Sequence, residues 1–320
     1  MKKNLLAFFS LLLMASLAFG QARDYPNHAV KIIVPFPTGS SIDITARYFA
    51  DQLSIAFGQP FVVENRAGAN GAIGVAAVKA APVDGYTILM GSNSSLSVNP
   101  LVVKNLPYDP IKDLKPISGL TRIVSVLVVA ENGKYRTLAD LVNAAKVKTG
   151  DVTVGTFAAG YLLGQAWFAS EAGVQFRHIP YKAVTQVLTD IIGNQLDFTI
   201  VDSLSAASLI QAGKLRALAV SGDRRHADYP NIPTFVESGY PEYVNYLWNG
   251  YFVRADMPDD ITNKLADAMA KIIATPAARD FARKSGLEVL PLGPDAMRKY
   301  HIADLERLRK VANSAGIKPE

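Results

Sequence analysis

The sequence predicts an α/β fold, and three observations support this prediction. Short apolar or β-branched runs alternate with segments of helical periodicity along almost the whole chain, which is the pattern of α/β proteins. A chain of 320 residues, 49% of them hydrophobic, can bury one large core or two medium ones. The chain has no cysteine, so its stability must come from burial and not from disulfides.

Residues 1–20 have the pattern of a secretory signal peptide. Lys2 and Lys3 precede an apolar run over residues 5–15, and small residues follow the run. This run is shorter than the roughly 20 apolar residues that a transmembrane helix needs, and cleavage after Gly20 or after Ala22 fits the small-residue rule. Loss of the two lysines lowers the formal net charge from +5 to +3. This weak positive charge favours anionic ligands, and no Lys/Arg run indicates a nucleic-acid partner.

The remaining elements follow in order from local patterns. The runs expected to form strands lie at residues 29–34, 61–64, 86–90, 124–129, 152–154, 198–201, 215–220 and 250–253. The segments expected to form helices lie at residues 42–56, 71–81, 137–146, 162–172, 184–193, 204–212, 259–273, 276–284 and 294–314. The dipeptides Asp84-Gly85 and Asn132-Gly133 are typical of turns, and the stretch 100–116, rich in Pro, Asp and Lys, suits a surface connection.

Two of the expected strands are candidates for passing between lobes. A chain that leaves a first lobe along 123–129 and returns along 250–253 builds that lobe from residues 24–121 and 249–320, and a second lobe from 122–248. Because α/β sheets bind ligands at the carboxyl ends of their strands, the cleft between such lobes is a natural ligand site.

No catalytic or metal-binding constellation appears in the sequence. His28, His178, His226 and His301 are scattered without metal-ligand spacing. The chain also lacks a Gly-x-Ser-x-Gly elbow, a cysteine nucleophile and a glycine motif for dinucleotides or phosphate. We therefore predict that the protein is not an enzyme and has neither a cofactor nor a metal.

Within the segment 34–43 an expected buried strand ends abruptly and an expected helix begins. Apolar residues recur at helical spacing from Ile42 onwards. The first N–H groups of a helix lack internal partners and carry the positive end of the helix dipole, so an anion is favoured there. An ordinary turn with Ser40 or Ser41 as N-cap is the alternative. The candidate ligand-binding residues of this loop are Phe36, Pro37, Thr38, Gly39, Ser40, Ser41 and Asp43.

Two further loops follow expected strands in the same way. Ser92, Asn93 and Ser94 follow the strand that ends at Met90, and their hydroxyls and amide can bind a carboxylate or satisfy their own backbone. In the second lobe the candidate ligand-binding residues after the strand 152–154 are Gly155, Thr156, Phe157, Ala158 and Tyr161.

Two charged residues of the second lobe complete the set of candidates. Lys182 can place a positive charge at the cleft or lie on the solvated surface. Asp202 ends the strand 198–201, where a carboxylate can accept a ligand hydroxyl or cap the next helix.

The mature chain resembles the periplasmic substrate-binding proteins of tripartite tricarboxylate transporters, the Bug proteins. The resemblance rests on ordered motifs along the chain: Tyr25-Pro26, Ile33-Val34-Pro35-Phe36-Pro37, Val63-Glu64-Asn65-Arg66-Ala67-Gly68, Asp84-Gly85-Tyr86-Thr87, Asn99-Pro100, Tyr108-Asp109-Pro110, Ile179-Pro180-Tyr181-Lys182, the segment 213–220, Ile232-Pro233-Thr234 and Trp248-Asn249-Gly250.

This resemblance implies a two-lobed type II periplasmic-binding fold that closes on a small carboxylate and delivers it to the membrane permease subunits of such a transporter. It implies a monomer in the periplasm. In the family, the loop that matches Phe36 to Ser41 holds one carboxylate through backbone N–H groups and ordered waters, and the loop that matches Ser92 to Ser94 assists.

The chain departs from the family pattern at two loops. Ser40 stands where a glycine is common, and the second-lobe loop carries Phe157, Ala158 and Tyr161 before Leu162, where the family has a Gly/Ser-rich stretch ending in His-Leu. The second departure predicts a carboxylate with an apolar or aromatic body, such as an aromatic mono- or dicarboxylate, over citrate. The rival hypotheses are a receptor that presents its ligand to a membrane sensor and a secreted hydrolase with a hydroxyl nucleophile.

Overall fold

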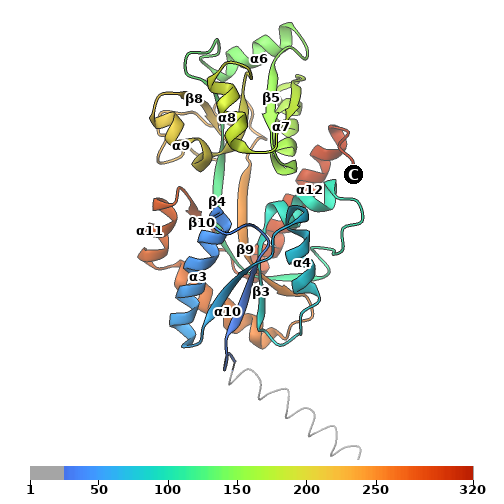
Figure 1. Cartoon of the computed structure of the whole chain (residues 1–320), viewed down its shortest axis with the longest axis vertical. Coiled ribbons are helices and arrows are strands. Elements are labelled where there is room, and N and C mark those ends of the chain that lie inside the picture. Colours follow the sequence, from blue (N-terminus) through green and yellow to red (C-terminus); the bar gives the residue numbers. More distant parts are fainter. Residues whose placement is uncertain (1–24, 320) are drawn as a thin grey trace, which may run out of the picture.

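Two long strands, β4 (Leu114–Ala130) and β9 (Tyr246–Arg254), pass through the middle of the molecule and join two lobes (Figure 1). The computed structural model describes residues 25–319, so the predicted signal peptide lies outside the described residues. β4 pairs with β9 over Leu114–Val124 and then with β7 (Thr199–Asp202) and β8 (Leu215–Val220). One strand therefore belongs to the sheets of both lobes, and the predicted α/β class is confirmed.

The first lobe contains a mixed sheet in the order β10-β4-β9-β3-β1-β2. Strands β1 (Val30–Val34), β2 (Phe61–Asn65) and β3 (Thr87–Ser92) are parallel, and β9 is antiparallel to β3. Neighbouring residues of β1 face opposite sides of the sheet. Ile32 packs with helices α3 (Ser41–Phe57) and α10 (Asp259–Ile273), and Ile33 packs with α4 (Ala72–Lys79). The remaining elements of this lobe are the 3₁₀ turn η1 (Ala69–Gly71), the π-helical turn η2 (Ser94–Val98), α5 (Asn99–Val102), α11 (Pro276–Lys284) and β10 (Glu288–Val289).

The second lobe packs its helices on both faces of the distal part of β4. Leu127 and Val129 lie in a core with α6 (Leu138–Val147) and α7 (Ala159–Ala172). Val126 and Val128 lie in another core, with α8 (Val184–Ile192). The lobe is completed by α9 (Ser203–Gln211) and by the parallel pair β5 (Thr153–Thr156) and β6 (Arg177–Pro180).

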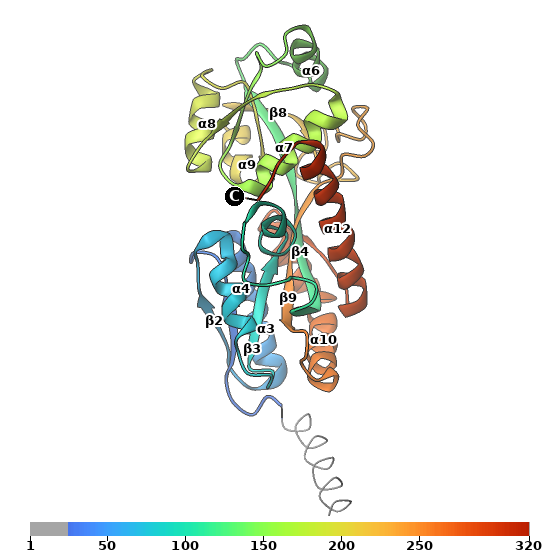
Figure 2. The same cartoon turned by 90° about the vertical axis from the view of Figure 1, so that its right-hand side faces the viewer.

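The long C-terminal helix α12 (Pro294–Ser314) runs beside both lobes (Figure 2). Near its start, Met297 packs in a first-lobe core. Near its end, Leu308 and Val311 lie in the second-lobe core that contains Phe168 of α7. The predicted assignment of residues 249–320 to the first lobe does not account for this packing, because sequence periodicity shows the apolar face of a helix and not its partner.

Several local boundaries differ from the expected ones. β3 runs on to Ser92 and a helical turn follows at once, so the expected loop over residues 91–95 is half strand and half helix. Helix α7 begins at Ala159 and not at residue 162, so the second-lobe loop is shorter than predicted. Between residues 25 and 319, no helix has the length and apolar character to cross a membrane.

Candidate ligand-binding site

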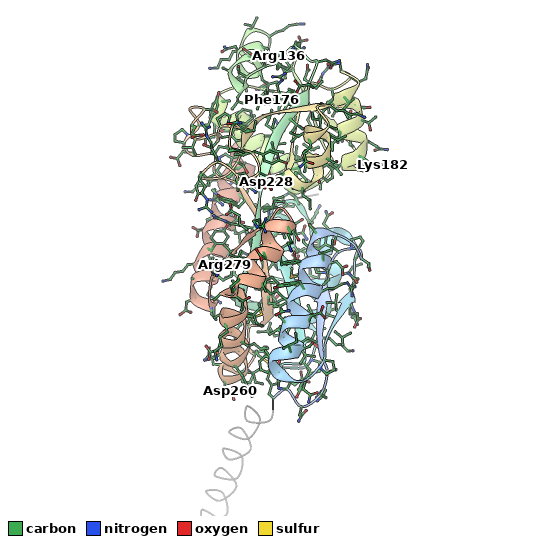
Figure 3. The ribbon with its side chains drawn as sticks, turned by 90° about the vertical axis from the view of Figure 1, so that its left-hand side faces the viewer. Arg136, Phe176, Lys182, Asp228, Asp260 and Arg279 are labelled. Carbon is green, nitrogen blue, oxygen red and sulfur yellow. The ribbon has the colours of Figure 1, made fainter. Side chains whose placement is uncertain are left out.

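A cavity of about 360 Å³ lies where the two lobes meet. Both lobes and both crossing strands contribute to its wall. The lining residues are Phe36, Ser40, Ser41, Ile42, Thr45, Asn93, Ser94, Thr121, Arg122, Ile123, Phe157, Ala158, Gly160, Tyr161, Asp202, Leu247, Trp248, Asn249 and Leu287. A larger hollow of about 550 Å³ lies on the second lobe beside Arg136, far from this junction (Figure 3). The cavity between the lobes is the candidate site, because it is where the predicted loops converge.

The first-lobe wall is the start of α3. Ser40 is its N-cap, because the Ser40 Oγ accepts a hydrogen bond from Asp43 N at 3.3 Å. The preceding Gly39 has φ +83°, a conformation that favours glycine. The N-cap alternative from the sequence is thus confirmed for Ser40, and Ser41 begins the helix at the cavity wall. A helix start of this kind presents N–H groups and a positive dipole end to an anion.

Asp43 organises this loop from behind instead of lining the cavity. Its carboxylate is 2% exposed and accepts hydrogen bonds from Gly39 N at 2.9 Å, Asn65 Nδ2 at 2.8 Å and Arg47 Nε at 3.1 Å. Burial raises the pKa of Asp43, but the hydrogen bonds and the charge of Arg47 outweigh burial and hold the pKa below its usual value. Asp43 is therefore an ionised anchor of the loop.

Asn65, at the end of β2, connects the same loop to the sheet. Its Nδ2 also donates to Phe36 O at 3.0 Å, and its Oδ1 accepts from Thr38 Oγ1 at 3.1 Å. Sequence analysis placed Asn65 in a family motif but did not include it among the site residues. Its side chain shapes the loop through contacts that span 29 positions to Phe36, which local patterns do not reveal.

A second first-lobe wall comes from the turn after β3. Ser92 and Ser95 are buried and cap each other, with Ser95 N donating to Ser92 Oγ at 3.3 Å. Asn93 and Ser94 line the cavity. The sequence left open whether this loop binds a ligand or satisfies its own backbone. In the structure Ser92 and Ser95 satisfy the backbone, and ligand binding by Asn93 and Ser94 stays a prediction.

Two distant side chains hold the π-helical turn η2 that follows. Tyr108 OH donates to Ser95 O at 2.5 Å, and the buried His301 of α12 lies with Nε2 at 3.0 Å from Leu96 O. Burial lowers the pKa of His301, so its neutral imidazole donates this bond from Nε2. The carbonyl groups of the irregular turn are thus satisfied, and Asn93 is fixed at the cavity wall.

The floor of the cavity consists of residues 121–123 and 247–249 of the two crossing strands. Thr121 lies opposite Asn249, and Ile123 lies opposite Leu247. Opposite residues of an antiparallel pair share a face, and all four of these residues line the cavity. Asn249 Oδ1 accepts hydrogen bonds from Thr121 N at 3.2 Å and Thr121 Oγ1 at 3.1 Å, and Asn249 Nδ2 donates to Thr121 Oγ1 at 2.9 Å. The floor therefore offers an amide beside apolar side chains.

Arg122 also lines the cavity, and its guanidinium is held by neighbouring side chains. It donates from Nε and Nη2 to Glu288 Oε2 at 3.1 and 2.9 Å and lies 3.8 Å from the centre of the Tyr246 ring. Arg224 of the second lobe donates to the same oxygen at 3.1 Å. The positive charge of Arg122 is thus paired with Glu288.

The second-lobe wall is aromatic and acidic. The rings of Phe157 and Tyr161 lie 4.4 Å apart, centre to centre. Tyr161 OH donates to Asp202 Oδ2 at 2.9 Å, and burial together with Asp202 raises the pKa of Tyr161 well above its usual value. Asp202 is the N-cap of α9 and accepts from Ser205 N at 2.9 Å and Ser205 Oγ at 2.7 Å. The predicted capping role of Asp202 is confirmed, and Asp202 also lines the cavity.

Eight of the predicted site residues do not line the cavity: Pro37, Thr38, Gly39, Asp43, Ser92, Gly155, Thr156 and Lys182. Gly155 is covered by Leu196 and Val187, and Thr156 Oγ1 lies 2.6 Å from His178 Nε2. Lys182 is exposed and points away from the second lobe into solvent (Figure 3). Of the first-loop residues among them, Thr38 and Asp43 bond with Asn65, whereas Pro37 and Gly39 are exposed.

The site residues that sequence analysis missed come mainly from the crossing strands and from α3. They are Ile42, Thr45, Thr121, Arg122, Ile123, Gly160, Leu247, Trp248, Asn249 and Leu287. The motif Trp248-Asn249-Gly250 was a signal for two of them, but its place at the cavity floor depends on strand register.

Comparison with known proteins identifies the family. Residues 45–317 match the family model described as "Tripartite tricarboxylate transporter family receptor". BugT of Bordetella pertussis is 32% identical over 301 residues, which cover 93% of this chain and 92% of BugT. The chain belongs to this receptor family.

Solved structures agree with this membership. A Rhodopseudomonas palustris protein with adipate has 30% identity and a TM-score of 0.81, with 93% of this chain and 100% of that chain covered. The periplasmic binding protein BugD has 26% identity and a TM-score of 0.77, with 92% and 100% covered. The predicted two-lobed type II fold is confirmed, and the receptor is a solute-binding protein and not an enzyme.

A structure with bound malate, MatC of Rhodopseudomonas palustris, shares the fold at 22% identity and a TM-score of 0.76, with 90% of this chain and 99% of that chain covered. Among residues 25–319 no group of three or more His, Asp or Glu side chains is placed to hold a metal ion.

Proposed function

We propose that this receptor binds a small carboxylate with an apolar or aromatic body in the periplasm and delivers it to the permease of a tripartite tricarboxylate transporter. The observation that carries the proposal is the asymmetry of the cavity between the lobes. Its first-lobe side has the start of α3 with Asn93 and Ser94, and its other walls have Phe157, Ile123 and Leu247.

The first-lobe side suits one carboxylate group. The helix start supplies N–H donors and a favourable dipole, and Asn93 and Ser94 add side-chain donors. The floor and the second-lobe wall suit an apolar or aromatic body, because Phe157 and Tyr161 present rings and the floor adds aliphatic side chains. The related structure that holds adipate supports the carboxylate class.

Thermal-shift measurement on the mature protein tests the ligand class. We expect benzoate, phenylacetate or medium-chain aliphatic acids to raise Tm in a concentration-dependent manner, because a ligand that binds only the folded state stabilises it. Citrate, which is polar along its whole length, serves as the comparison. Stabilisation by citrate and by none of the other acids would refute the proposed class.

Delivery and location need tests of their own. We expect deletion of the gene to abolish uptake of the ligand found by thermal shift, and unchanged uptake would refute delivery to a permease and favour presentation to a sensor. We expect the N-terminal sequence of the mature protein to begin near Gln21 or Arg23, as the signal-peptide pattern predicts. A mature protein that retains Met1 would contradict secretion by this route.

A further inference from the structure

We propose that Asp202 makes this receptor selective for monocarboxylates, because its carboxylate disfavours a second carboxylate at the far end of the ligand. The preferred ligand then has one carboxylate at the first lobe and an uncharged far end, or a far end with a hydrogen-bond donor. This inference rests on the proposed function, because it assumes that the first lobe holds a carboxylate.

The position of Asp202 supports this role. It lies at the junction of β7 and α9 and lines the cavity from the second lobe, whereas the start of α3 and Ser94 line it from the first lobe. A ligand that spans the cavity with one carboxylate at α3 therefore brings its far end toward the wall that Tyr161 and Asp202 form.

The charge of Asp202 has no cationic partner among residues 25–319. Its three hydrogen bonds come from neutral donors, namely Tyr161 OH, Ser205 N and Ser205 Oγ. The other charged residue of the cavity wall is Arg122, whose guanidinium is paired with Glu288 at 2.9 Å. Lys182, the cation that the sequence placed near the cleft, is exposed outside the cavity.

The start of α7 is the group that opposes Asp202. Its N-cap is Ala158, which provides no side-chain cap, and the first hydrogen bonds of the helix run from Tyr161 N and Leu162 N to Ala158 O, both at 3.1 Å. The N–H groups before Tyr161 and the positive dipole end therefore lie at the cavity wall. A helix start carries the equivalent of about half a positive charge, whereas a carboxylate carries a full negative charge. Asp202 also caps the start of α9, whose dipole offsets part of its charge. The repulsion on a second carboxylate is therefore what remains of the Asp202 charge beside two helix starts, and the titrations below measure it.

The size of the repulsion follows from Coulomb's law. A second carboxylate about 8 Å from Asp202, at an effective dielectric constant of about 20, weakens binding about 30-fold. A ligand hydroxyl or amine is accommodated instead. A carboxylate has about four acceptor positions, and three of those on Asp202 are taken by the bonds above.

Isothermal titration calorimetry on the full mature chain with two matched pairs of acids tests this inference. Benzoate is compared with terephthalate and hexanoate with adipate, because each pair differs only in the second carboxylate. The test variant is Asp202→Asn, which removes the charge and keeps the cap, because Asn and Asp are N-caps of similar strength. Asp202→Ser is a second neutral variant that also caps a helix.

The matched control is Asp140→Asn, which neutralises the acid of the α6 capping box, a segment that does not line the cavity. We expect the wild type and the control to bind the monoacid of each pair about 30-fold more tightly than the diacid. In both Asp202 variants we expect this ratio to fall below about threefold, mainly through tighter diacid binding.

Two results overturn the inference alone: diacids that bind the wild type as tightly as monoacids, and a ratio that stays the same in both Asp202 variants. If none of the four acids binds the wild type or the variants, the proposed carboxylate function fails, and the inference fails with it. Binding of the monoacids alone by the wild type, with diacid binding gained in the variants, supports both.

Discussion

Replacement of Asp43 by Asn tests the claim that this buried carboxylate holds the ligand loop in place. The substitution keeps the size of the side chain but replaces one carboxylate oxygen by an amide, and it removes the charge. Gly39 N, Asn65 Nδ2 and Arg47 now donate to the carboxylate. In the variant at least one of these donors faces an N–H group instead of an acceptor.

The expected loss of stability is about 2–3 kcal/mol. The Arg47 side chain is 48% exposed and regains water, so loss of its ion pair costs at most about 1 kcal/mol. Gly39 N and Asn65 Nδ2, whose bonds to Asp43 are partly buried, lose a charged acceptor, at about 1 kcal/mol each. Urea unfolding at pH 7 measures the free energy of unfolding. Asp51→Asn, an exposed acid on the same helix, is the control and should change it by less than about 0.5 kcal/mol. A similarly small change for Asp43→Asn would refute the reasoning.

The pH dependence gives an independent check. The pKa of Asp43 is lowered from 3.8 in the folded protein, so the ionised carboxylate stabilises the protein above about pH 4, and the effect is lost as the pH falls through the folded pKa. We therefore expect the stability difference between wild type and Asp43→Asn to be constant from pH 7 to about pH 5 and to shrink in stronger acid. A difference that grows in acid would contradict the assignment. Loosening of the loop should also weaken binding of a carboxylate ligand in the variant.

Three further substitutions test other contacts. Gly74→Ala should destabilise the protein by about 1–3 kcal/mol in urea unfolding, because a Cβ would lie 2.7 Å from the Pro35 Cβ; stabilisation, as helix propensity alone predicts, would contradict this packing. Phe157→Ala should weaken binding of an aromatic acid about tenfold in calorimetry, through lost apolar contact; an unchanged Kd would place the ligand elsewhere. Trp248→Phe removes the 2.8 Å hydrogen bond from Nε1 to the buried Asp304 Oδ2. It should lower the free energy of unfolding by about 2 kcal/mol. An unchanged free energy would mean that the Asp304 carboxylate has sufficient hydrogen bonds without Trp248.

Much of the architecture could be predicted because its signals are local. The β-branched run before Pro35 and the helical spacing after Ile42 predicted β1 and α3, and the cap at Ser40 followed from residue type. Asp202 was predicted as a possible cap for the same reason. The first half of β4 was missed, because Pro116 and Gly119 are poor strand residues and only pairing with β9 makes that segment a strand.

The composition of the site depends on contacts between distant parts of the chain. Thr121 and Asn249 meet across 128 positions, and strand register places both on the cavity floor. The sequence by itself determined the α/β class, the polar loop at the start of α3 and the aromatic second-lobe segment, because short-range periodicity and residue type control these features. Only the tertiary structure decided which side of each loop faces the ligand, because that depends on pairing and packing between segments far apart in the chain.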